Sequence, residues 1–397
     1  MDFSPSFFGY IMIKLLTIIG ARPQIIKAAA ISRAVREKFA GQVEEHILHT
    51  GQHYDANMSE VFFRELGIPE PDYNLHVGSG SHGVQTARII EGIEDVLLNG
   101  ERLAVSGERK GYDGVIVYGD TNSTLAAAVA ASKIHVPVFH VEAGLRSFNM
   151  GMPEEINRIV CDQLSSVLFT PTLTGLRNLE AEGFSSIKGR VRFADGRGQR
   201  VVLSGDVMYD NSMYFSAMAD VQSDIIERLG LRYRQFVLAT IHRPANTDNP
   251  ENLKSILRAL SDIAAKGMDV VLPLHPRTKK RIEDLGLKIA DIRLKVIEPA
   301  SFFEIIRLEK NAAIVMTDSG GVQKEAFFYG TPCVILRPET EWVEIVDAGA
   351  GIIADADYER IMAAYEQLVN KPVQFPALFG DGKASEKIIS EIIEYLK

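Results

Sequence analysis

The sequence has only two cysteines and no stretch of the roughly 18–20 consecutive apolar residues that a membrane-spanning helix needs. Cys161 and Cys333 lie far apart in apolar surroundings, which excludes a disulfide framework and favours buried, reduced thiols in a cytoplasmic protein. Acidic residues (52) outnumber Lys and Arg (43), and this net charge of −9 argues against nucleic acid as a partner. No GxGxxG or GxxxxGK(S/T) motif accompanies the predicted strands, and no HExxH occurs, so neither a dinucleotide cofactor nor a metal is predicted.

The apolar N-terminus does not have the features of a secretory signal peptide. It lacks a basic first region and a cleavage site flanked by small residues. We expect Leu15–Ile19 to be a buried strand, residues before about Met12 to be a loose extension, and Met12 to be an alternative start.

With 397 residues, the chain is long enough for two domains. Buried strands alternate with helical segments in both halves, which is typical of parallel sheets. We therefore predict an α/β fold with two doubly wound, Rossmann-like domains, residues 12–190 and 201–380, facing a central cleft. The C-terminal helix, within 381–397, is expected to pack back on the first domain, and Gly189–Arg200 to form a hairpin or linker. The predicted strands are Lys14–Ile19, Glu44–His49, Gly114–Tyr118, Val136–Val141, Val167–Pro171, Phe236–Thr240, Val270–Leu274, Leu294–Ile297, Ala312–Thr317 and Pro332–Leu336.

Polar residues gather where the predicted strands of the first half end. Arg22 and Lys27 follow the first strand and suit a diphosphate, although a solvated helix start is the alternative interpretation. Gln52 and His53 follow the second strand, and Arg146 follows the fourth. These three residues are candidates for binding a sugar or a regulatory ligand. For His53, a purely structural role is the alternative interpretation.

Four carboxylates occupy similar positions. Asp120 follows the third strand, Glu142 ends the fourth, and Glu154 and Glu155 open the next helix. One of that last pair is expected only to complement the helix dipole. Carboxylates that converge on one cleft acquire raised pKa values, so Asp120, Glu142 and Glu154 are predicted to work as general acids or bases.

The second half carries a turn, Asp318-Ser319-Gly320-Gly321, between an apolar strand and a helix. Glycines allow close approach of an anion, and a helix N-terminus favours its negative charge. Glu325 lies on the following helix, and His242 follows the first strand of this half. Together these residues predict a phosphate and ribose pocket.

Eight segments spread along the chain form a wider pattern: GARPQIIKAA, HTGQHYD, YGDTNSTLA, HVEAGLRSF, MPEEINR, TIHRPANTD, TDSGGVQKEA and FGDGKAS. In this order they resemble the non-hydrolysing UDP-N-acetylglucosamine 2-epimerases, from about Lys14 to Lys397. The resemblance implies the glycosyltransferase B-type architecture, a homodimer and no cofactor. It also implies interconversion of UDP-GlcNAc and UDP-ManNAc, by elimination of UDP to 2-acetamidoglucal and re-addition.

The resemblance also assigns roles to individual residues. It places Asp120, Glu142 and Glu154 among the catalytic carboxylates and His242 on a catalytic histidine that contacts the UDP phosphates. The remaining UDP-binding positions that it implies are Arg22, Lys27, Ser319, Gly320, Gly321 and Glu325.

The chain departs from the better-known members at Ala21–Gln24, where they have Thr-Arg-Pro-Glu, and at Glu341–Glu344, where they have Glu-Arg-Pro-Glu. At these positions the sequence resembles the branch of the family that acts on UDP-2,3-diacetamido-glucuronic acid. This compound is therefore an alternative substrate. Gly100–Gly111 and Gly189–Arg200 look like insertions. Two other classes stay open: a glycosyltransferase of the same fold and a non-catalytic sensor of UDP-sugars.

Overall fold

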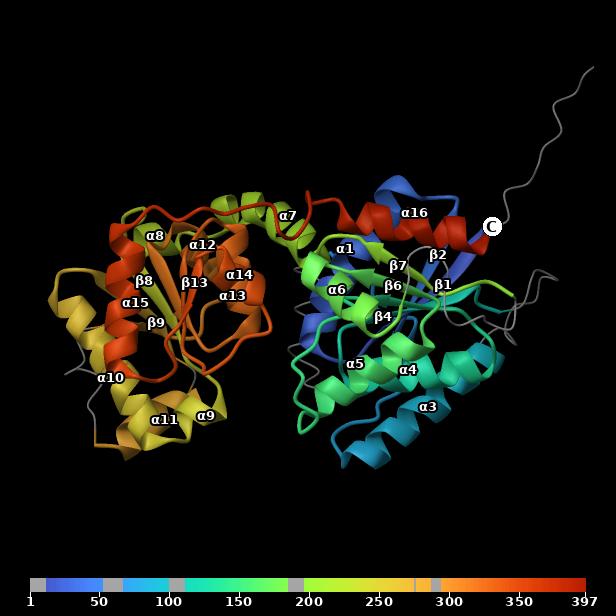
Figure 1. The fold of residues 1–397 in the computed structure, drawn as a ribbon, viewed down its shortest axis with the longest axis horizontal. Helices are drawn as coiled ribbons and strands as arrows, with labels where there is room; N and C mark the ends of the chain where they lie inside the picture. Colours follow the sequence, from blue (N-terminus) through green and yellow to red (C-terminus); the bar gives the residue numbers. More distant parts are fainter. Residues whose placement is uncertain (1–11, 53–66, 100–110, 185–195, 275, 287–293) are drawn as a thin grey trace, which may run out of the picture. The chain divides into compact units, whose positions relative to one another are not determined.

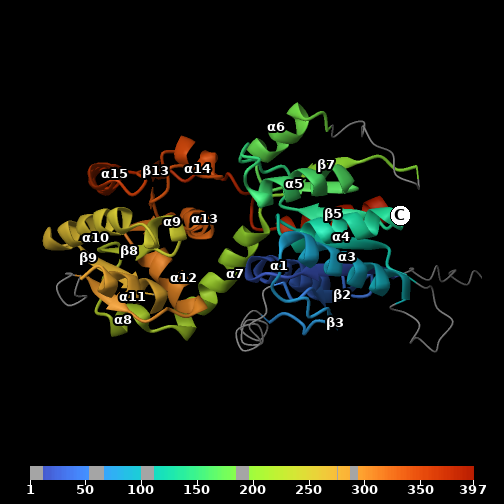
Figure 2. The same ribbon diagram turned by 90° about the horizontal axis from the view of Figure 1, so that it is seen from below.

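The computed structural model describes residues 12–52, 67–99, 111–184, 196–274, 276–286 and 294–397 (Figures 1 and 2). It divides into two compact units. The first unit contains the chain up to Asn211 together with Leu378–Lys397, and the second contains Ser212–Ala377. His53 and most of the two segments that look like insertions lie outside the described residues.

The first unit is built on a seven-stranded sheet in which all strands are parallel. The strand order β3-β2-β1-β4-β5-β6-β7 reverses between β1 and β4, which is where doubly wound sheets bind their ligands. The strands are β1 (Ile13–Ile19), β2 (Val43–His49), β3 (Tyr73–Asn74), β4 (Gly114–Tyr118), β5 (Val138–Val141), β6 (Val167–Thr170) and β7 (Arg200–Leu203).

Helices cover both faces of this sheet. Helices α3, α4 and α5 pack side by side on one face, and α1 and α16 pack together on the other (Figure 1). The helices of the first unit are α1 (Arg22–Lys38), α3 (His82–Asn99), α4 (Asn122–Lys133), α5 (Pro153–Leu164), α6 (Leu173–Ala181) and α16 (Ala384–Leu396). Helix α7 (Val207–Gln222) contains the boundary between the units.

The C-terminal helix α16 is anchored at its first turn by Asp210. The Asp210 carboxylate accepts the backbone N–H groups of Ala384 (3.0 Å) and Ser385 (2.8 Å), which have no partner within the helix. Ile388 and Ile392 are fully buried. The last residues of the chain therefore complete the core of the first unit.

The second unit has a six-stranded parallel sheet in the order β10-β9-β8-β11-β12-β13. Its chain reversal falls between β8 and β11. The strands are β8 (Phe236–Thr240), β9 (Asp269–Pro273), β10 (Lys295–Ile297), β11 (Ile314–Thr317), β12 (Cys333–Ile335) and β13 (Gly351–Ile353).

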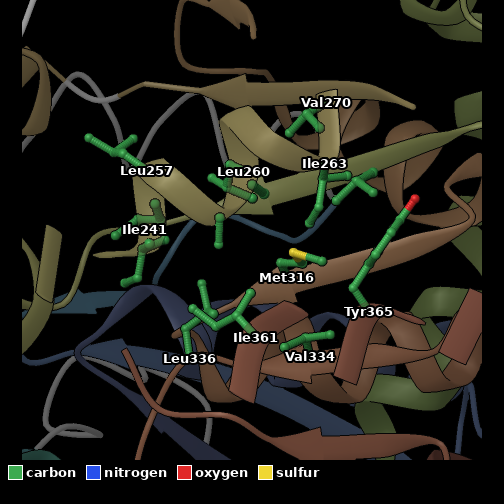
Figure 3. Packing of buried hydrophobic residues seen from close by; sticks show 14 of the residues in the cluster. Ile241, Leu257, Leu260, Ile263, Val270, Met316, Val334, Leu336, Ile361 and Tyr365 are labelled. Atoms are coloured by element: carbon green, nitrogen blue, oxygen red, sulfur yellow. The ribbon is translucent and has the colours of Figure 1, made fainter. Parts of the chain in front are cut away.

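Two apolar clusters hold this sheet between its helices. Figure 3 shows the larger cluster, in which Leu260 and Ile263 of α10 and Ile361 and Tyr365 of α15 meet Met316 of β11. Each such buried side chain stabilises the fold by about 1.5–3 kcal/mol. The other cluster joins α8, α12 and α13 to the sheet. The helices of the second unit are α8 (Ile225–Arg228), α9 (Pro244–Thr247), α10 (Pro250–Ala265), α11 (Pro276–Asp284), α12 (Phe302–Asn311), α13 (Gly320–Phe328), α14 (Val343–Asp347) and α15 (Tyr358–Asn370).

The predicted fold class is confirmed, because both sheets are parallel and doubly wound. Strands β4 and β8 have the predicted bounds. The sequence analysis missed β3, β7 and β13, which are all edge strands; Arg200, the last residue of the predicted hairpin or linker, begins β7. None of the helices in the described ranges combines the length and the apolar character that a bilayer span requires.

Gly20 directly follows β1, and the hydroxyl groups of Ser123 and Thr50 lie close to its Cα. A Cβ atom on Gly20 would lie 2.2 Å from Ser123 Oγ and 2.3 Å from Thr50 Oγ1. We expect Gly20→Ala to lower the free energy of unfolding, measured by urea denaturation, by about 1–3 kcal/mol, since it overpacks this site. Gly83→Ala in the first turn of α3 is the matched control, because a Cβ there meets nothing within 4 Å. Equal stability of the two variants would contradict the close approach.

Candidate functional site

The turn between β4 and α4 presents Asp120. Its carboxylate is paired with Arg158 of α5, with 2.6 Å between Asp120 Oδ2 and Arg158 Nη2. Burial raises the pKa of Asp120 above its ordinary value, and the nearby Glu142 adds to this rise. Arg158 and Lys27 lower the pKa, but by less than burial raises it. A carboxyl group with a raised pKa at a strand end is suited to proton transfer.

Glu142 follows β5 directly and forms an ion pair with Lys27 of α1. The distance between Lys27 Nζ and Glu142 Oε1 is 2.5 Å, and both side chains are 11% exposed. Glu142 has a φ of +73°, a left-handed conformation that costs a residue with a side chain about 1–3 kcal/mol. The N–H groups of Glu142 and Ala143 both donate to the Phe169 carbonyl oxygen, at 3.1 and 3.0 Å, and hold this conformation.

The Lys27–Glu142 pair lies against the turn that carries Asp120. A Cβ atom on Gly119 would be 3.2 Å from Lys27 Nζ and 3.4 Å from Glu142 Oε1. Two carboxylates and one ammonium group therefore come together at the carboxyl ends of neighbouring strands, β4 and β5.

The two glutamates that open α5 differ in their surroundings. Glu155 is buried, and its carboxylate accepts the backbone N–H groups of Ser147 and Phe148, both at 2.9 Å, and a hydrogen bond from Arg158 at 2.9 Å. Glu154 is exposed, and no described residue bonds to its carboxylate. Glu155 is thus the structural member of the pair that the sequence analysis expected, and Glu154 is left open to solvent.

Arg22 and Gln52 follow β1 and β2. Arg22 is exposed at the first position of α1. Gln52 is buried, and its side-chain oxygen accepts hydrogen bonds from the hydroxyl (2.7 Å) and the N–H (3.2 Å) of Ser123. Gln52 therefore connects the loop after β2 to the start of α4, whereas the side chain of Arg22 is exposed.

Arg146 lies in a buried network. Its guanidinium group bonds Glu182 at 2.6 and 2.8 Å and Asp162 at 2.8 Å. The structure thus connects Arg146 to α5 and to the residue that follows α6, and leaves it only 8% exposed. A role for Arg146 in binding a sugar or a regulatory ligand stays a prediction.

In the second unit, one buried carboxylate shapes the loop after β8. Asp318 accepts the N–H of His242 (3.1 Å), the N–H of Arg243 (3.0 Å) and the side-chain amide of Asn246 (3.1 Å). The imidazole Nδ1 of His242 is 3.3 Å from Asp318 Oδ1, and the side chain is 56% exposed. Asp318 thus presents an exposed histidine directly beside the residue that begins the next turn, Ser319.

The turn after β11 opens helix α13. Ser319 is the N-cap, and its hydroxyl accepts the Val322 N–H at 3.5 Å. Gly320 and Gly321 are the first helical residues, and no atom comes closer than 3.5 Å to a Cβ built on either. Backbone N–H groups at such an open helix start are donors for an anion. Glu325, farther along α13, is half-buried.

Some residues that organise these loops were not predicted. Gln24 accepts the N–H groups of Gly20 (2.9 Å) and Ala21 (3.1 Å) and donates to the Tyr118 carbonyl oxygen at 2.9 Å. Its place three residues after the N-cap was the available signal. Other organising residues are His140, Asp162 and Asp318. Within the described ranges, no three His, Cys, Asp or Glu side chains come together as a metal site would require.

Doubly wound sheets with acidic and basic groups gathered at their strand ends define an α/β enzyme. The chain belongs to the UDP-N-acetylglucosamine 2-epimerase family, whose model matches residues 36–393, and it is therefore an isomerase. It is 48% identical to the UDP-2,3-diacetamido-2,3-dideoxy-D-glucuronate 2-epimerase of Pseudomonas aeruginosa, over 96% of this chain and 99% of that protein.

Solved structures agree with this assignment. The UDP-GlcNAc 2-epimerase of Methanocaldococcus jannaschii, in complex with UDP-GlcNAc and UDP, superposes with a TM-score of 0.79 at 38% identity, over 96% of this chain and 100% of that chain. Phytolacca americana UGT2 matches with a TM-score of 0.57 at 11% identity, over 96% and 94% of the two chains, which shows a shared fold alone.

Glu155 gives a prediction for stability and pH. Burial opposes its charge, but the Ser147 N–H, Arg158 and the Phe148 N–H together lower its pKa below the ordinary 4.5. A lowered pKa stabilises the fold above the ordinary value, and this stabilisation is lost as the pH falls through the folded-state pKa. We expect Glu155→Gln to reduce the free energy of unfolding by about 1–3 kcal/mol at pH 7. The difference from the unmodified protein should shrink towards pH 4.

The measurement is urea denaturation at pH 7, 5 and 4. Glu154→Gln, one residue earlier on the same helix, is the control and should stay within about 0.5 kcal/mol of the unmodified protein. A difference between Glu155→Gln and the unmodified protein that does not change between pH 7 and pH 4 would contradict the ionic role of Glu155.

Proposed function

We propose that this protein is a UDP-sugar 2-epimerase that eliminates UDP from its substrate and adds it back. The observation that carries the proposal is the group formed by Asp120, Lys27 and Glu142 at the ends of β4 and β5. The C2 carbon of an N-acetylhexosamine has no adjacent carbonyl, so its proton is not acidic enough for simple removal and return. Loss of UDP from C1 solves this problem without a redox cofactor.

The reaction needs a base on one face of the sugar and an acid on the other. The base takes the C2 proton while the C1–O bond breaks, and its electron pair leaves on UDP. A proton is then delivered to C2 from the opposite face, and a UDP phosphate oxygen attacks C1 again. The raised pKa of Asp120 suits a proton donor, and Glu142, paired with an ammonium group, suits a base. Glu154 is accessible to serve as the third carboxylate.

UDP must stay bound between the two half-reactions. We assign this task to the second unit, where Ser319, Gly320 and Gly321 offer a helix N-terminus and His242 is displayed beside it. Glu325 is proposed to bind the ribose. In the first unit, Arg22 and Lys27 are proposed to contact the diphosphate. This division gives the first unit the sugar chemistry and a contact to the diphosphate, and the second unit the remaining contacts to the nucleotide.

Two substrates fit this chemistry. UDP-2,3-diacetamido-2,3-dideoxy-glucuronate is supported by the 48% identity to the Pseudomonas aeruginosa protein, which exceeds the 38% identity to the Methanocaldococcus jannaschii enzyme. UDP-GlcNAc is supported by the motifs that the chain shares with the wider family. Gln24 does not discriminate between them, because its amide is fully used inside the fold, where a glutamate could not donate to Tyr118.

The proposal extends to the assembly and location of the protein. A homodimer rests on the family resemblance. A cytoplasmic location rests on the two buried cysteines, Cys161 and Cys333, which are both free thiols.

Proton NMR in deuterated water tests the function. The protein is incubated with UDP-GlcNAc and, separately, with the diacetamido-glucuronate analogue. We expect deuterium to replace the C2 proton and the manno epimer to appear, faster with the preferred substrate. A glycosyltransferase would do nothing without an acceptor, and a sensor would bind without exchange, so absence of exchange with both substrates would overturn the proposal.

Amide variants of the three carboxylates connect this exchange to the site. Asp120→Asn, Glu142→Gln and Glu154→Gln should each slow turnover by about 10²–10⁴-fold, the range for lost acid–base catalysis. Glu180→Gln, an exposed carboxylate on α6, is the matched control and should be unchanged. Near-normal turnover in all three amide variants would remove these carboxylates from the mechanism.

The phosphate site is tested by Gly321→Val. The open space around Gly321 accommodates the new side chain in the free protein, but the side chain would occupy the approach to the helix N-terminus. We expect UDP affinity, measured by calorimetry, to fall by about tenfold or more, which is 1.4 kcal/mol or more. Gly83→Val, also in the first turn of a helix with open space, should bind UDP normally. Unchanged affinity in Gly321→Val would place the phosphate site elsewhere.

A further inference from the structure

His140 lies on β5, two residues before Glu142, and is fully buried. Its ring nitrogen Nδ1 is 2.7 Å from Asp162 Oδ1 on α5. Its other ring nitrogen, Nε2, is 2.8 Å from the Gly119 carbonyl oxygen. Both nitrogens of one imidazole therefore face oxygen atoms at hydrogen-bond distance.

The partners decide where the protons are. A carbonyl oxygen can only accept, so Nε2 carries a hydrogen. Asp162 receives the Gly144 N–H at 3.2 Å and the Arg146 guanidinium at 2.8 Å on its other oxygen, which are bonds that a carboxylate accepts. We take Asp162 to be ionised beside the Arg146 guanidinium, so its Oδ1 accepts a hydrogen from Nδ1. Because a neutral imidazole has only one N–H, His140 is an imidazolium ion.

Two carboxylates lie around the His140 ring and the neighbouring Arg146. Asp162 faces both His140 and Arg146, and Glu182 pairs with Arg146 from the other side. Burial would lower the pKa of His140, but Cys161 and Asp162 together raise it well above its ordinary value. Cys161 is itself fully buried, so a substrate has no access to its thiol. The role of His140 is therefore inside the protein.

We propose, resting on the function proposed above, that His140 is a positioning residue with a hydrogen on both ring nitrogens, and that its Nε2–H holds the turn that carries Asp120. The Gly119 carbonyl oxygen accepts from His140, and the Gly119 N–H donates to the Val141 carbonyl oxygen at 3.0 Å. Both polar groups of Gly119 are thus held by β5. Since Asp120 is the next residue, the direction of its side chain follows from the orientation of this peptide.

The same turn touches the second carboxylate. Gly119, with a φ of +61°, is the residue whose added Cβ would meet Lys27 Nζ and Glu142 Oε1. A shift of the Gly119 peptide would therefore change both the direction of Asp120 and the space beside the Lys27–Glu142 pair. Misplacement of a catalytic group by about 1 Å can cost on the order of 10²-fold in rate.

Nitrogen-15 NMR of the unmodified protein, labelled at histidine, tests the charge directly. We expect one histidine to show two protonated ring nitrogens with slowly exchanging N–H signals from pH 6 to pH 9, and these signals to vanish in His140→Gln. If the His140 ring has a single N–H, or titrates between pH 6 and pH 8, the proposal is overturned.

Two variants separate the two hydrogen bonds. The side-chain nitrogen of a glutamine takes the place of Nε2 and keeps the bond to Gly119, whereas that of an asparagine takes the place of Nδ1 and keeps only the bond to Asp162. We expect His140→Asn to lower kcat by roughly 10–100-fold with KM nearly unchanged, and His140→Gln to lose less than about fivefold. His135→Asn, at an exposed histidine, is the control.

The order of the two losses decides the role. Equal losses, a larger loss in His140→Gln, or a loss confined to KM would show that His140 does not act through Gly119. If the unmodified protein fails to exchange the C2 proton of either UDP-sugar, the proposed function falls, while the NMR signals still report the charge of His140. Should His140→Asn fail to fold, the NMR result and His140→Gln decide, because a loss above about tenfold in His140→Gln would contradict the proposal.

Discussion

The Asp162 carboxylate is the interaction on which the first unit's charged loops depend. It is fully buried on α5 and connects His140 of β5 with Gly144 and Arg146 of the following loop. Removal of this carboxylate would leave the side chains of His140 and Arg146 and the Gly144 N–H buried without one of their partners. The free energy lost in this way is far larger than the loss of a surface ion pair. The same helix supplies two more side chains to the turn after β4. One helix therefore sets the geometry of two strand ends.

The second unit solves a similar problem in the same way. Asp318 is fully buried, and its oxygens are occupied by the N–H groups of His242 and Arg243 and by the amide of Asn246. A loop whose backbone N–H groups all bond to one carboxylate can adopt few conformations. Its exposed side chains are therefore positioned by the loop backbone and need no packing contacts. In both units, a buried carboxylate thus fixes the shape of a loop at a strand end.

The sequence predicted strands and loops better than it predicted their connections. Buried strands such as β4 and β8 were found because their apolar runs end abruptly in polar residues. The edge strands Tyr73–Asn74, Arg200–Leu203 and Gly351–Ile353 were missed, since they are short and only partly apolar. Asp120 and Glu142 stood out at strand ends. The bonds of His140 to Gly119 and Asp162 could not be predicted, because these partners are 21 and 22 residues away and meet only in the folded sheet.

Helix α16 has a consequence for biosynthesis. Ala384–Leu396 belongs to the first unit, yet it leaves the ribosome only after the whole of Ser212–Ala377 has been made. During that interval, α16 does not yet cover the face of the sheet beside α1, and the Asp210 carboxylate lacks its bonds to α16. The nascent first unit therefore cannot reach its native core before α16 has been made, although the second unit is by then complete in sequence. Such long-range closure slows folding and prolongs the exposure of apolar surface to chaperones and to other nascent chains.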